Sequence, residues 1–329
     1  MTKALPTYKD VVAARTRLLP YIEQTPVLRS RVLDEIAGAN LLIKAECLQQ
    51  TGSFKLRGAT NRLLQIPKDK WDRGVVAFSS GNHAQGIARA ARVLGMPALI
   101  VMPSDAPTVK IEGVEADGAE IHLYDRETES REDIAAEIAE ARGAIVVPSF
   151  DDPMIIAGQG TCGLEFADQV SEMGQTLDHL ICCTGGGGLI TGIALALSKV
   201  SPNTKVWTAE PEGHEDWQRS LEAGQVRSNL PGTRSVCDAI LTPQPGELTW
   251  ALGSELLAGG CVVSDQHAFE AMRIAARQLK LMLEPGGAVA LASALFRLPE
   301  AAKNSTVGVV LTGGNVDAKF FAKVLNREV

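Results

Sequence analysis

Lys55 is a residue whose type and setting could do chemistry. It stands in the segment TGSFKLRGA, residues 51–59, where it opens a stretch that predicts an apolar helix. A neutral lysine amine can attack an aldehyde, and partial desolvation lowers the pKa of an amine toward that state. The competing interpretation is an ordinary surface lysine at a helix start, and Lys55 alone does not exclude it.

Two further loops carry polar groups that could bind an organic ligand. In SSGNHAQG, residues 79–86, the hydroxyls of Ser79 and Ser80 and the start of a helix could donate to a carboxylate. Asn82 in the same loop could bond a phenolic oxygen. In the later segment TGGN, the hydroxyl of Thr312 could bond a heterocycle nitrogen. Plain helix capping and a plain turn are the competing interpretations.

Consecutive glycines after an apolar segment indicate a phosphate-binding loop. Glycine lets the backbone approach a ligand closely and point several N–H groups at an anion. Part of the loop also fits a dinucleotide-binding fingerprint with an acidic residue for a ribose, which would indicate an oxidoreductase. The glycines of the loop are Gly185, Gly186, Gly187 and Gly188, and the fingerprint would use Gly186, Gly188, Gly192 and Glu210.

Short β-branched segments alternate with alanine-rich segments, which predicts an α/β fold with parallel sheets wound by helices. The glycine-rich loops follow strands, at the edge where ligands bind in such folds. We expect a small, mobile substrate-binding domain at 74–148, a discontinuous large cofactor-binding domain at 1–73 and 149–329, and a site in the cleft between them. The predicted strands are 41–45, 74–78, 97–102, 120–123, 144–148, 179–183, 205–209 and 307–311, and the predicted helices include 85–94, 127–142, 189–199 and 265–281.

Composition excludes several classes of protein. A net charge of −7 argues against a nucleic-acid or anionic-membrane surface. No apolar stretch approaches the ~20 residues that span a bilayer. The N-terminal residues show no export pattern, so we expect a cytoplasmic protein with reduced, mostly buried cysteines and no histidine-based zinc site. The cysteines are Cys47, Cys162, Cys182, Cys183, Cys237 and Cys261.

These loops occur in one order, together with AGQGT at residues 157–161: SFKLRGA, SSGNHAQG, AGQGT, GGGGL and TGGN. In that combination the chain, from residue 25 to residue 315, resembles the serine/threonine dehydratase and serine racemase family of fold-type II pyridoxal-phosphate enzymes. The resemblance implies a tryptophan synthase β-like fold of two parallel-sheet α/β domains, pyridoxal 5′-phosphate as cofactor, and a homodimer. We expect 3-hydroxyaspartate dehydratases to be among the relatives of this chain.

The resemblance also implies a role for each matching residue. Lys55 would form the Schiff base with the cofactor and then remove the substrate Cα proton, with Ser80 as the acid/base on the opposite face. Phe54 would pack on the cofactor ring, Asn82 would bond its hydroxyl, and the glycine loop would hold the phosphate. Thr312 would face the pyridine nitrogen, where most dehydratases of the family have serine or cysteine. The residues expected to bind the substrate carboxylate are Ser79, Ser80, Asn82 and His83.

Two further matches concern charge. Glu210 and Asp216, with the carbonyl of His214, match the divalent-cation site of metal-dependent members, which would suit Mg²⁺, Mn²⁺ or Ca²⁺. An exposed acidic turn is the alternative. Arg131 matches an arginine at the active-site mouth of serine racemases, where it could pair with a second substrate carboxylate and favour 3-hydroxyaspartate over threonine. A solvated helix arginine is the alternative.

The expected activity is β-elimination of water from serine, threonine or 3-hydroxyaspartate, giving a 2-oxo acid and ammonia. The chain stops soon after Thr312, which leaves no room for a regulatory domain and favours a catabolic role. An amino-acid racemase with side dehydratase activity is the alternative within the family. A dinucleotide-dependent oxidoreductase and a non-catalytic cofactor-binding protein are the alternatives outside it.

Overall fold

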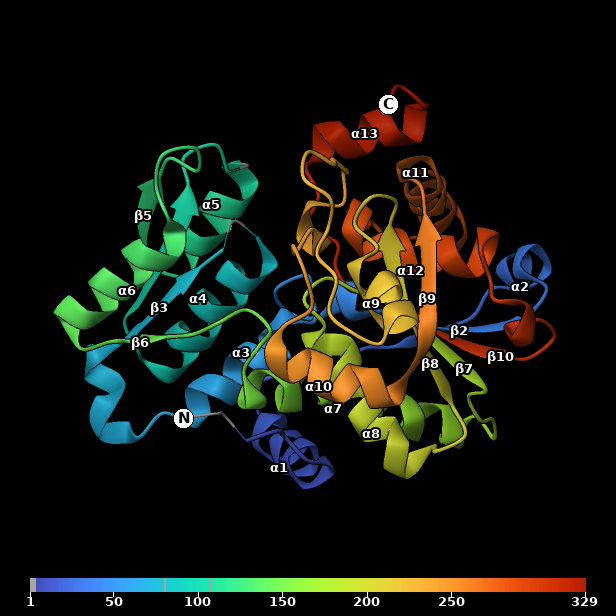
Figure 1. Ribbon diagram of the computed structural model, residues 1–329, viewed down its shortest axis with the longest axis horizontal. Helices are drawn as coiled ribbons and strands as arrows, with labels where there is room; N and C mark the ends of the chain where they lie inside the picture. The colour runs from blue at the N-terminus through green and yellow to red at the C-terminus, as the bar shows by residue number, and fades with distance from the viewer. Residues whose placement is uncertain (1–3, 80, 107) are drawn as a thin grey trace.

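Two sheets organise the chain in the computed structural model, which describes residues 4–79, 81–106 and 108–329. Within those residues, a six-stranded sheet has the order β1-β2-β10-β7-β8-β9 and a four-stranded sheet the order β5-β4-β3-β6. Neighbouring strands are parallel except β1, which is antiparallel to β2. Figure 1 shows the four-stranded sheet on the left, in what we call the small lobe, and the six-stranded sheet on the right, in the large lobe.

The elements have the following bounds. The strands are β1 (Val27–Leu28), β2 (Asn40–Lys44), β3 (Val75–Phe78), β4 (Ala98–Pro103), β5 (Glu120–Tyr124), β6 (Ile145–Val146), β7 (His179–Cys183), β8 (Lys205–Pro211), β9 (Leu257–Val263) and β10 (Thr306–Val310). The α-helices are α1 (Tyr8–Leu18), α2 (Arg31–Ala37), α3 (Lys55–Leu64), α4 (Asn82–Leu94), α5 (Thr108–Ala116), α6 (Arg131–Arg142), α7 (Pro153–Glu172), α8 (Gly188–Val200), α9 (Asp216–Ala223), α10 (Glu247–Leu256), α11 (Asp265–Ile274), α12 (Pro285–Phe296) and α13 (Ala318–Asn326). Shorter helical turns are η1 (Glu46–Leu48), η2 (Lys68–Arg73), η3 (Asp238–Ile240), η4 (Ala275–Leu279) and η5 (Glu300–Ala302).

Helices cover both faces of the large sheet. Because side chains alternate along a strand, Leu41 and Ile43 of β2 pack into a cluster with α11 and α12, whereas Leu42 packs into a cluster with α7 and α8. All three residues are fully buried. The alternation fixes the register of the sheet and thereby the edge at which its loops meet.

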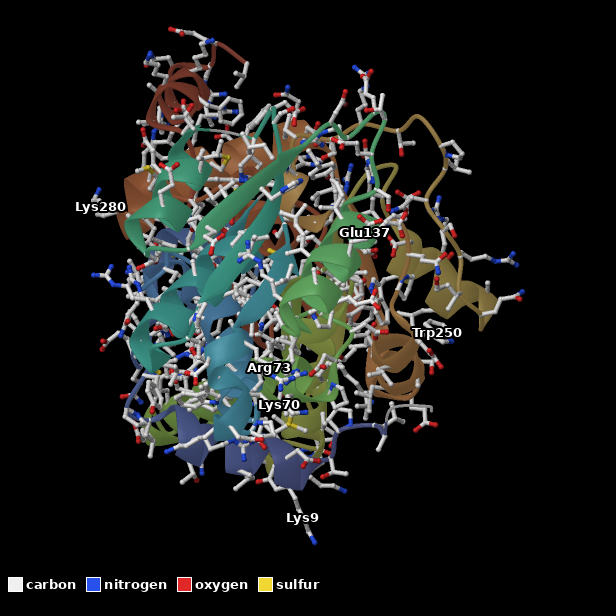
Figure 2. All side chains as sticks on the ribbon, turned by 90° about the vertical axis from the view of Figure 1, so that its left-hand side faces the viewer. Lys9, Lys70, Arg73, Glu137, Trp250 and Lys280 are labelled. Carbon is white, nitrogen blue, oxygen red and sulfur yellow. The ribbon has the colours of Figure 1, made fainter. Side chains whose placement is uncertain are left out.

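The small sheet is covered in the same way. Val75 and Ala77 of β3 pack with residues of α3 and α4, while Val76 packs with residues of α6. Figure 2 views this lobe from outside and shows Glu137 on the exposed side of α6. Helix α3 therefore belongs to the apolar core of the small lobe, although it precedes residue 74. The division of the chain into domains at 73/74 and 148/149 stays a prediction.

Charges fix the opposite side of α3 to the large lobe. The guanidinium of Arg57 donates to Glu46 at 2.7 and 2.8 Å and to Glu165 at 3.0 Å. Lys44 also donates to Glu165. Arg57 and Glu46 are fully buried, so each needs the other to offset its desolvation.

The predicted strands all form, with small shifts at their ends. The prediction missed the two-residue β1 and also β9, in which Gly259 and Gly260 lower the strand signal. Helix α6 begins at Arg131 instead of residue 127, because the Ser130 side chain accepts from the N–H of Asp133 and caps it there. In the part of the chain that is described, no helix is both long and apolar enough to cross a membrane.

Candidate active site

A cavity of about 680 Å³ lies between the lobes, and all four loops identified in the sequence contribute to its wall. The loops follow β2, β3, β7 and β10, so the carboxyl ends of strands from both sheets converge on it, as expected for such folds. Ser80 lies outside the described residues. The predicted residues that line the cavity are Phe54, Lys55, Ser79, Asn82, His83, Arg131, Gly185, Gly186, Gly187, Gly188 and Thr312.

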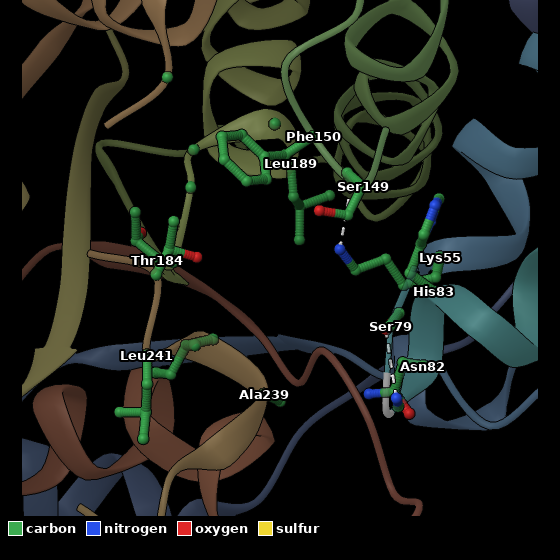
Figure 3. Close-up of a pocket in the computed structure, with 18 of the residues that line it drawn as sticks. Lys55, Ser79, Asn82, His83, Ser149, Phe150, Thr184, Leu189, Ala239 and Leu241 are labelled. Atoms are coloured by element: carbon green, nitrogen blue, oxygen red, sulfur yellow. Dashed lines mark hydrogen bonds between the residues drawn. The ribbon is translucent and has the colours of Figure 1, made fainter. Parts of the chain in front are cut away.

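Lys55 is the first residue of α3 and points into this cavity (Figure 3). Its Nζ donates to the backbone carbonyl of Ser149 at 3.2 Å and lies 5.2 Å from the centroid of the Phe54 ring. Burial lowers the pKa of Lys55 to about 8, against the opposing charge of Glu284. A substantial fraction of the amine is therefore neutral near pH 8, as a nucleophile or a base requires.

The glycine loop presents open backbone donors at the start of α8. Its carbonyl groups are turned outward, since Gly185 accepts from Trp217 Nε1 at 2.8 Å and Gly186 accepts from Thr249 Oγ1 at 2.7 Å. Gly187 accepts from Thr191, and the backbone N–H groups of the four glycines have no acceptor among the described residues. Open N–H groups at a helix N-terminus suit a phosphate.

Packing also requires glycine in this loop. A Cβ on Gly186 would lie 2.5 Å from ring carbons of Phe150, and Gly187 has a φ of +96°. A side chain on Gly188 would meet the backbone oxygen of Phe150 at 3.0 Å. Phe150, which the sequence analysis did not single out, therefore sets how closely the loop can approach a ligand.

Asn82 is held from two sides. Its Nδ2 donates to Oε1 of Glu284 at 2.5 Å, and its Oδ1 accepts from Asn315 Nδ2 at 2.8 Å. Oε2 of Glu284 is buried and has no hydrogen-bond partner among the described residues. Burial raises the pKa of Glu284 to about 7, and Lys110 and Asn82 oppose that rise. Glu284 also lines the cavity. It was not predicted from the sequence, because only the fold brings it next to Asn82.

The loop after β3 retains part of its predicted donor set. Ser79 Oγ accepts from the N–H of Gly81 at 3.2 Å, which leaves the hydroxyl hydrogen for a ligand. The ring Nε2 of His83 bonds to the carbonyl of Val147 at 3.1 Å. Burial and the nearby Lys55 lower the pKa of His83 to about 3, so the ring is neutral and donates this bond. The hydrogen on Nε2 is thus used within the protein, and Nδ1 of the neutral ring can accept a hydrogen bond but cannot donate one to a substrate carboxylate.

Cations of the small lobe also reach the cavity. Arg131, whose side chain is 45% exposed, lies with its guanidinium carbon 5.5 Å from the centroid of the Phe78 ring and donates to Glu132 at 2.9 Å. Lys110 of α5, which the sequence analysis did not predict, has a side chain only 7% exposed and donates to Asp238 of η3 at 2.7 Å. Both line the cavity.

Glu210 is buried and caps a helix. Its oxygens accept from the backbone N–H groups of Trp217 and Gln218 at 2.8 and 3.0 Å. Burial, followed by the charge of Asp216, raises the pKa of Glu210. Burial raises the pKa of Asp216 to about 7, and its Oδ2 is buried with no hydrogen-bond partner in the part of the chain that is described. No group of three or more His, Cys, Asp or Glu side chains with metal-binding spacing occurs in the described chain.

Comparison with known proteins bears out the resemblance. The family model of pyridoxal-phosphate dependent enzymes matches residues 18–313. L-threo-3-hydroxyaspartate ammonia-lyase of Saccharomyces cerevisiae is 41% identical over 323 residues, covering 98% of this chain and 97% of that protein. The protein of that name from Pseudomonas sp is 43% identical over 322 residues, covering 98% and 99%. The structure of maize serine racemase superposes with a TM-score of 0.92 at 36% identity, covering 99% of this chain and 98% of that one.

Proposed function

Since this chain belongs to the pyridoxal-phosphate dependent enzyme family, we propose that it is an ammonia-lyase that removes water from a β-hydroxy amino acid. The products are a 2-oxo acid and ammonia. The observation that carries the proposal is the position of Lys55, whose amine points into a cavity bordered by open backbone donors. The two ammonia-lyases that are similar to this chain along nearly its whole length favour elimination over racemisation.

The cavity fits the cofactor of the family. The open N–H groups of the glycine loop suit its phosphate, and the Lys55 amine suits its aldehyde. Phe54, Asn82 and Thr312 border the same space, where they would contact the ring, its hydroxyl and its nitrogen. When bound, pyridoxal phosphate would supply an aldehyde for the substrate amine and an electron sink for Cα. A dinucleotide has no such support, since Glu210 is fully buried and is not among the described residues that line this cavity.

Lys55 acts as the base that removes the Cα proton. Its lowered pKa keeps part of the amine neutral at cellular pH, and the Ser149 carbonyl orients it at 3.2 Å. The start of α4, with the Ser79 hydroxyl and the backbone of Asn82 and His83, binds the substrate carboxylate.

The preferred substrate is 3-hydroxyaspartate. Arg131 at the cavity wall supplies a cation for the second carboxylate, which serine and threonine lack. Its stacking on Phe78 limits the orientations of the guanidinium, so less conformational freedom is lost on binding.

A divalent cation binds beside Asp216. Two buried acidic groups lie there, the carboxylate of Glu210 and that of Asp216, whose Oδ2 has no partner within the described residues. The carbonyl of His214 lies between them in sequence. Oxygen ligands of this kind suit Mg²⁺, Mn²⁺ or Ca²⁺. We also propose a cytoplasmic homodimer whose small domain, residues 74–148, moves over the site.

Ammonia release from serine, threonine and 3-hydroxyaspartate, in both stereochemical series and with and without Mg²⁺, tests the proposal. We expect release to be fastest from a 3-hydroxyaspartate isomer. Arg131→Ala should lower kcat/KM for that isomer about 100-fold, since a bidentate contact to a charged group is lost. Arg142→Ala, at the far end of the same helix and paired with Glu120, is the matched control.

A clear preference for serine or threonine would contradict the role of Arg131. Lys55→Ala should abolish both the bound-cofactor absorbance and turnover. A borohydride-reducible adduct that persists in that variant would overturn the assignment of Lys55.

A further inference from the structure

Lys110 is a buried cation in the wall of the active-site cavity for which the proposed chemistry has no use so far. Its ammonium lies beside the loop that opens α4, since a Cβ built on Gly81 would be 3.5 Å from Lys110 Nζ. That loop is the proposed site of the substrate carboxylate. The lysine and arginine side chains that line the cavity in the described chain are Lys55, Lys110 and Arg131.

The Lys110 ammonium uses only part of its hydrogen-bonding capacity within the described chain. An ammonium has three donors, and in the described chain Lys110 makes one hydrogen bond, to Oδ2 of Asp238 at 2.7 Å. The two side chains differ sharply in exposure, 7% for Lys110 and 52% for Asp238. Asp238 can therefore be solvated when the pair separates, whereas Lys110 needs another anion in its place.

The two partners come from different lobes. Lys110 is on α5 of the small lobe, and Asp238 is on η3, in the segment between α9 and α10. A cation on the small lobe that exchanges a protein carboxylate for a substrate carboxylate would favour substrates that bring an additional negative charge. Arg131, which we propose for the same carboxylate, is half exposed, so Lys110 would contact that carboxylate from a buried position and Arg131 from an exposed one.

We propose that Lys110 is a specificity-determining residue that donates to the side-chain carboxylate of a dicarboxylic substrate, and that Asp238 holds its ammonium until that carboxylate arrives. The proposal rests on the proposed function in that it places the substrate in this cavity. Asp238 then competes with the substrate for the same ammonium, so the two residues have opposite effects on dicarboxylate binding.

Binding to the holoenzyme tests this without turnover. Succinate and butyrate have the same number of carbon atoms and differ by one carboxylate, so calorimetric Kd values give the contribution of that group. In Lys110→Met the preference for succinate should fall about 30-fold, the range for a charge-assisted hydrogen bond in a buried site. Lys110→Arg should restore part of it. Lys70→Met, an exposed lysine of η2, should leave the preference unchanged.

Asp238→Asn supplies the second measurement. It should tighten succinate binding about threefold or more, and the gain should vanish in the Lys110→Met background, since contacting residues show non-additive effects. An equal loss of succinate and butyrate binding in Lys110→Met would overturn the proposal, as would a gain from Asp238→Asn that persists without Lys110.

Turnover separates this inference from the proposed function. In Lys110→Met the ratio of kcat/KM for 3-hydroxyaspartate to that for serine should fall by about the same 30-fold factor. If the wild-type enzyme releases ammonia from neither compound nor from threonine, the proposed function fails, but the succinate-to-butyrate preference still decides the role of Lys110.

Discussion

Nδ2 of Asn82 and Oε1 of Glu284 are 2.5 Å apart, although 202 positions separate the two residues in the chain. This contact joins the first turn of α4 in the small lobe to the start of α12 in the large lobe. A carboxyl group that few donors satisfy lies at the point where both lobes meet the cavity.

Glu284 should make the stability of the protein depend on pH. Burial raises its pKa from 4.5 to about 7, so between those values the folded state holds a proton that the unfolded state has lost. Stability contributed by this group therefore falls as the pH rises through that window. Glu284→Gln keeps an acceptor for Asn82 but does not titrate. Its free energy of unfolding minus that of the wild type should therefore be larger at pH 8 than at pH 5, by on the order of 2 kcal/mol. Urea unfolding without added cofactor measures it.

The control for this prediction is Glu140→Gln on the exposed side of α6. This substitution should change the free energy of unfolding by the same amount at pH 5 and at pH 8. A stability difference between Glu284→Gln and wild type that is the same at pH 5 and pH 8 would contradict the raised pKa.

The reaction of the apoprotein with pyridoxal phosphate should depend on the protonation of Lys55. Because the pKa of Lys55 is lowered to about 8, the neutral amine should be scarce below that pH and the rate of absorbance change should fall about tenfold per pH unit. The inflection should lie near pH 8, and one near the ordinary lysine value of 10.5 would show that burial has no such effect. Lys55→Ala should give no absorbance change at any pH.

Gly186→Ala should weaken cofactor binding about tenfold or more, because the added methyl would overlap the Phe150 ring and displace the loop. The dissociation constant is measured by titration of the apoprotein. The double variant Gly186→Ala with Phe150→Ala removes the obstacle and should recover part of the affinity. Failure to recover would mean that the backbone at residue 186, rather than the ring, sets the geometry.

Divalent cations should stabilise the protein through Asp216. A cation present at a concentration 100 times its dissociation constant adds about 2.7 kcal/mol to the free energy of unfolding. In a protein of this size that raises Tm by a few degrees. Mg²⁺ or Ca²⁺ should raise the Tm of the wild type and leave that of Asp216→Asn unchanged. Glu212→Gln, an exposed acidic neighbour, should respond like the wild type. An equal rise in Asp216→Asn would remove the proposed cation site.

The sequence allowed the loops to be identified but not the groups that lie opposite them. Lys55, Asn82 and the glycine loop stand in short segments whose types and spacing indicate chemistry, and the cavity contains all of them. Glu284 and Lys110 stand in unremarkable segments, and their roles arise from contacts with residues 202 and 128 positions away. No local pattern reports such contacts.

The fold was predictable for a related reason. Parallel strands that are buried on both faces, such as β4 and β7, have nearly continuous apolar sequences. Each predicted strand formed. Strand β9 was missed because Gly259 and Gly260 suggest a turn, whereas the structure pairs them with Trp207 and Thr208 of β8. Local propensity was overridden there by the neighbouring strand.

Helix α3 has one side in the apolar core of the small lobe and the other on the charges of Arg57, Glu46 and Glu165. For protein engineering, this means that the position of the reactive amine on α3 depends on both of these contacts. Redesign of the small lobe for a new substrate must preserve the apolar side of α3, because a displaced helix would misalign the amine. Libraries directed at Arg131 and Lys110 avoid that risk, since neither residue belongs to α3 or to the apolar cluster around it.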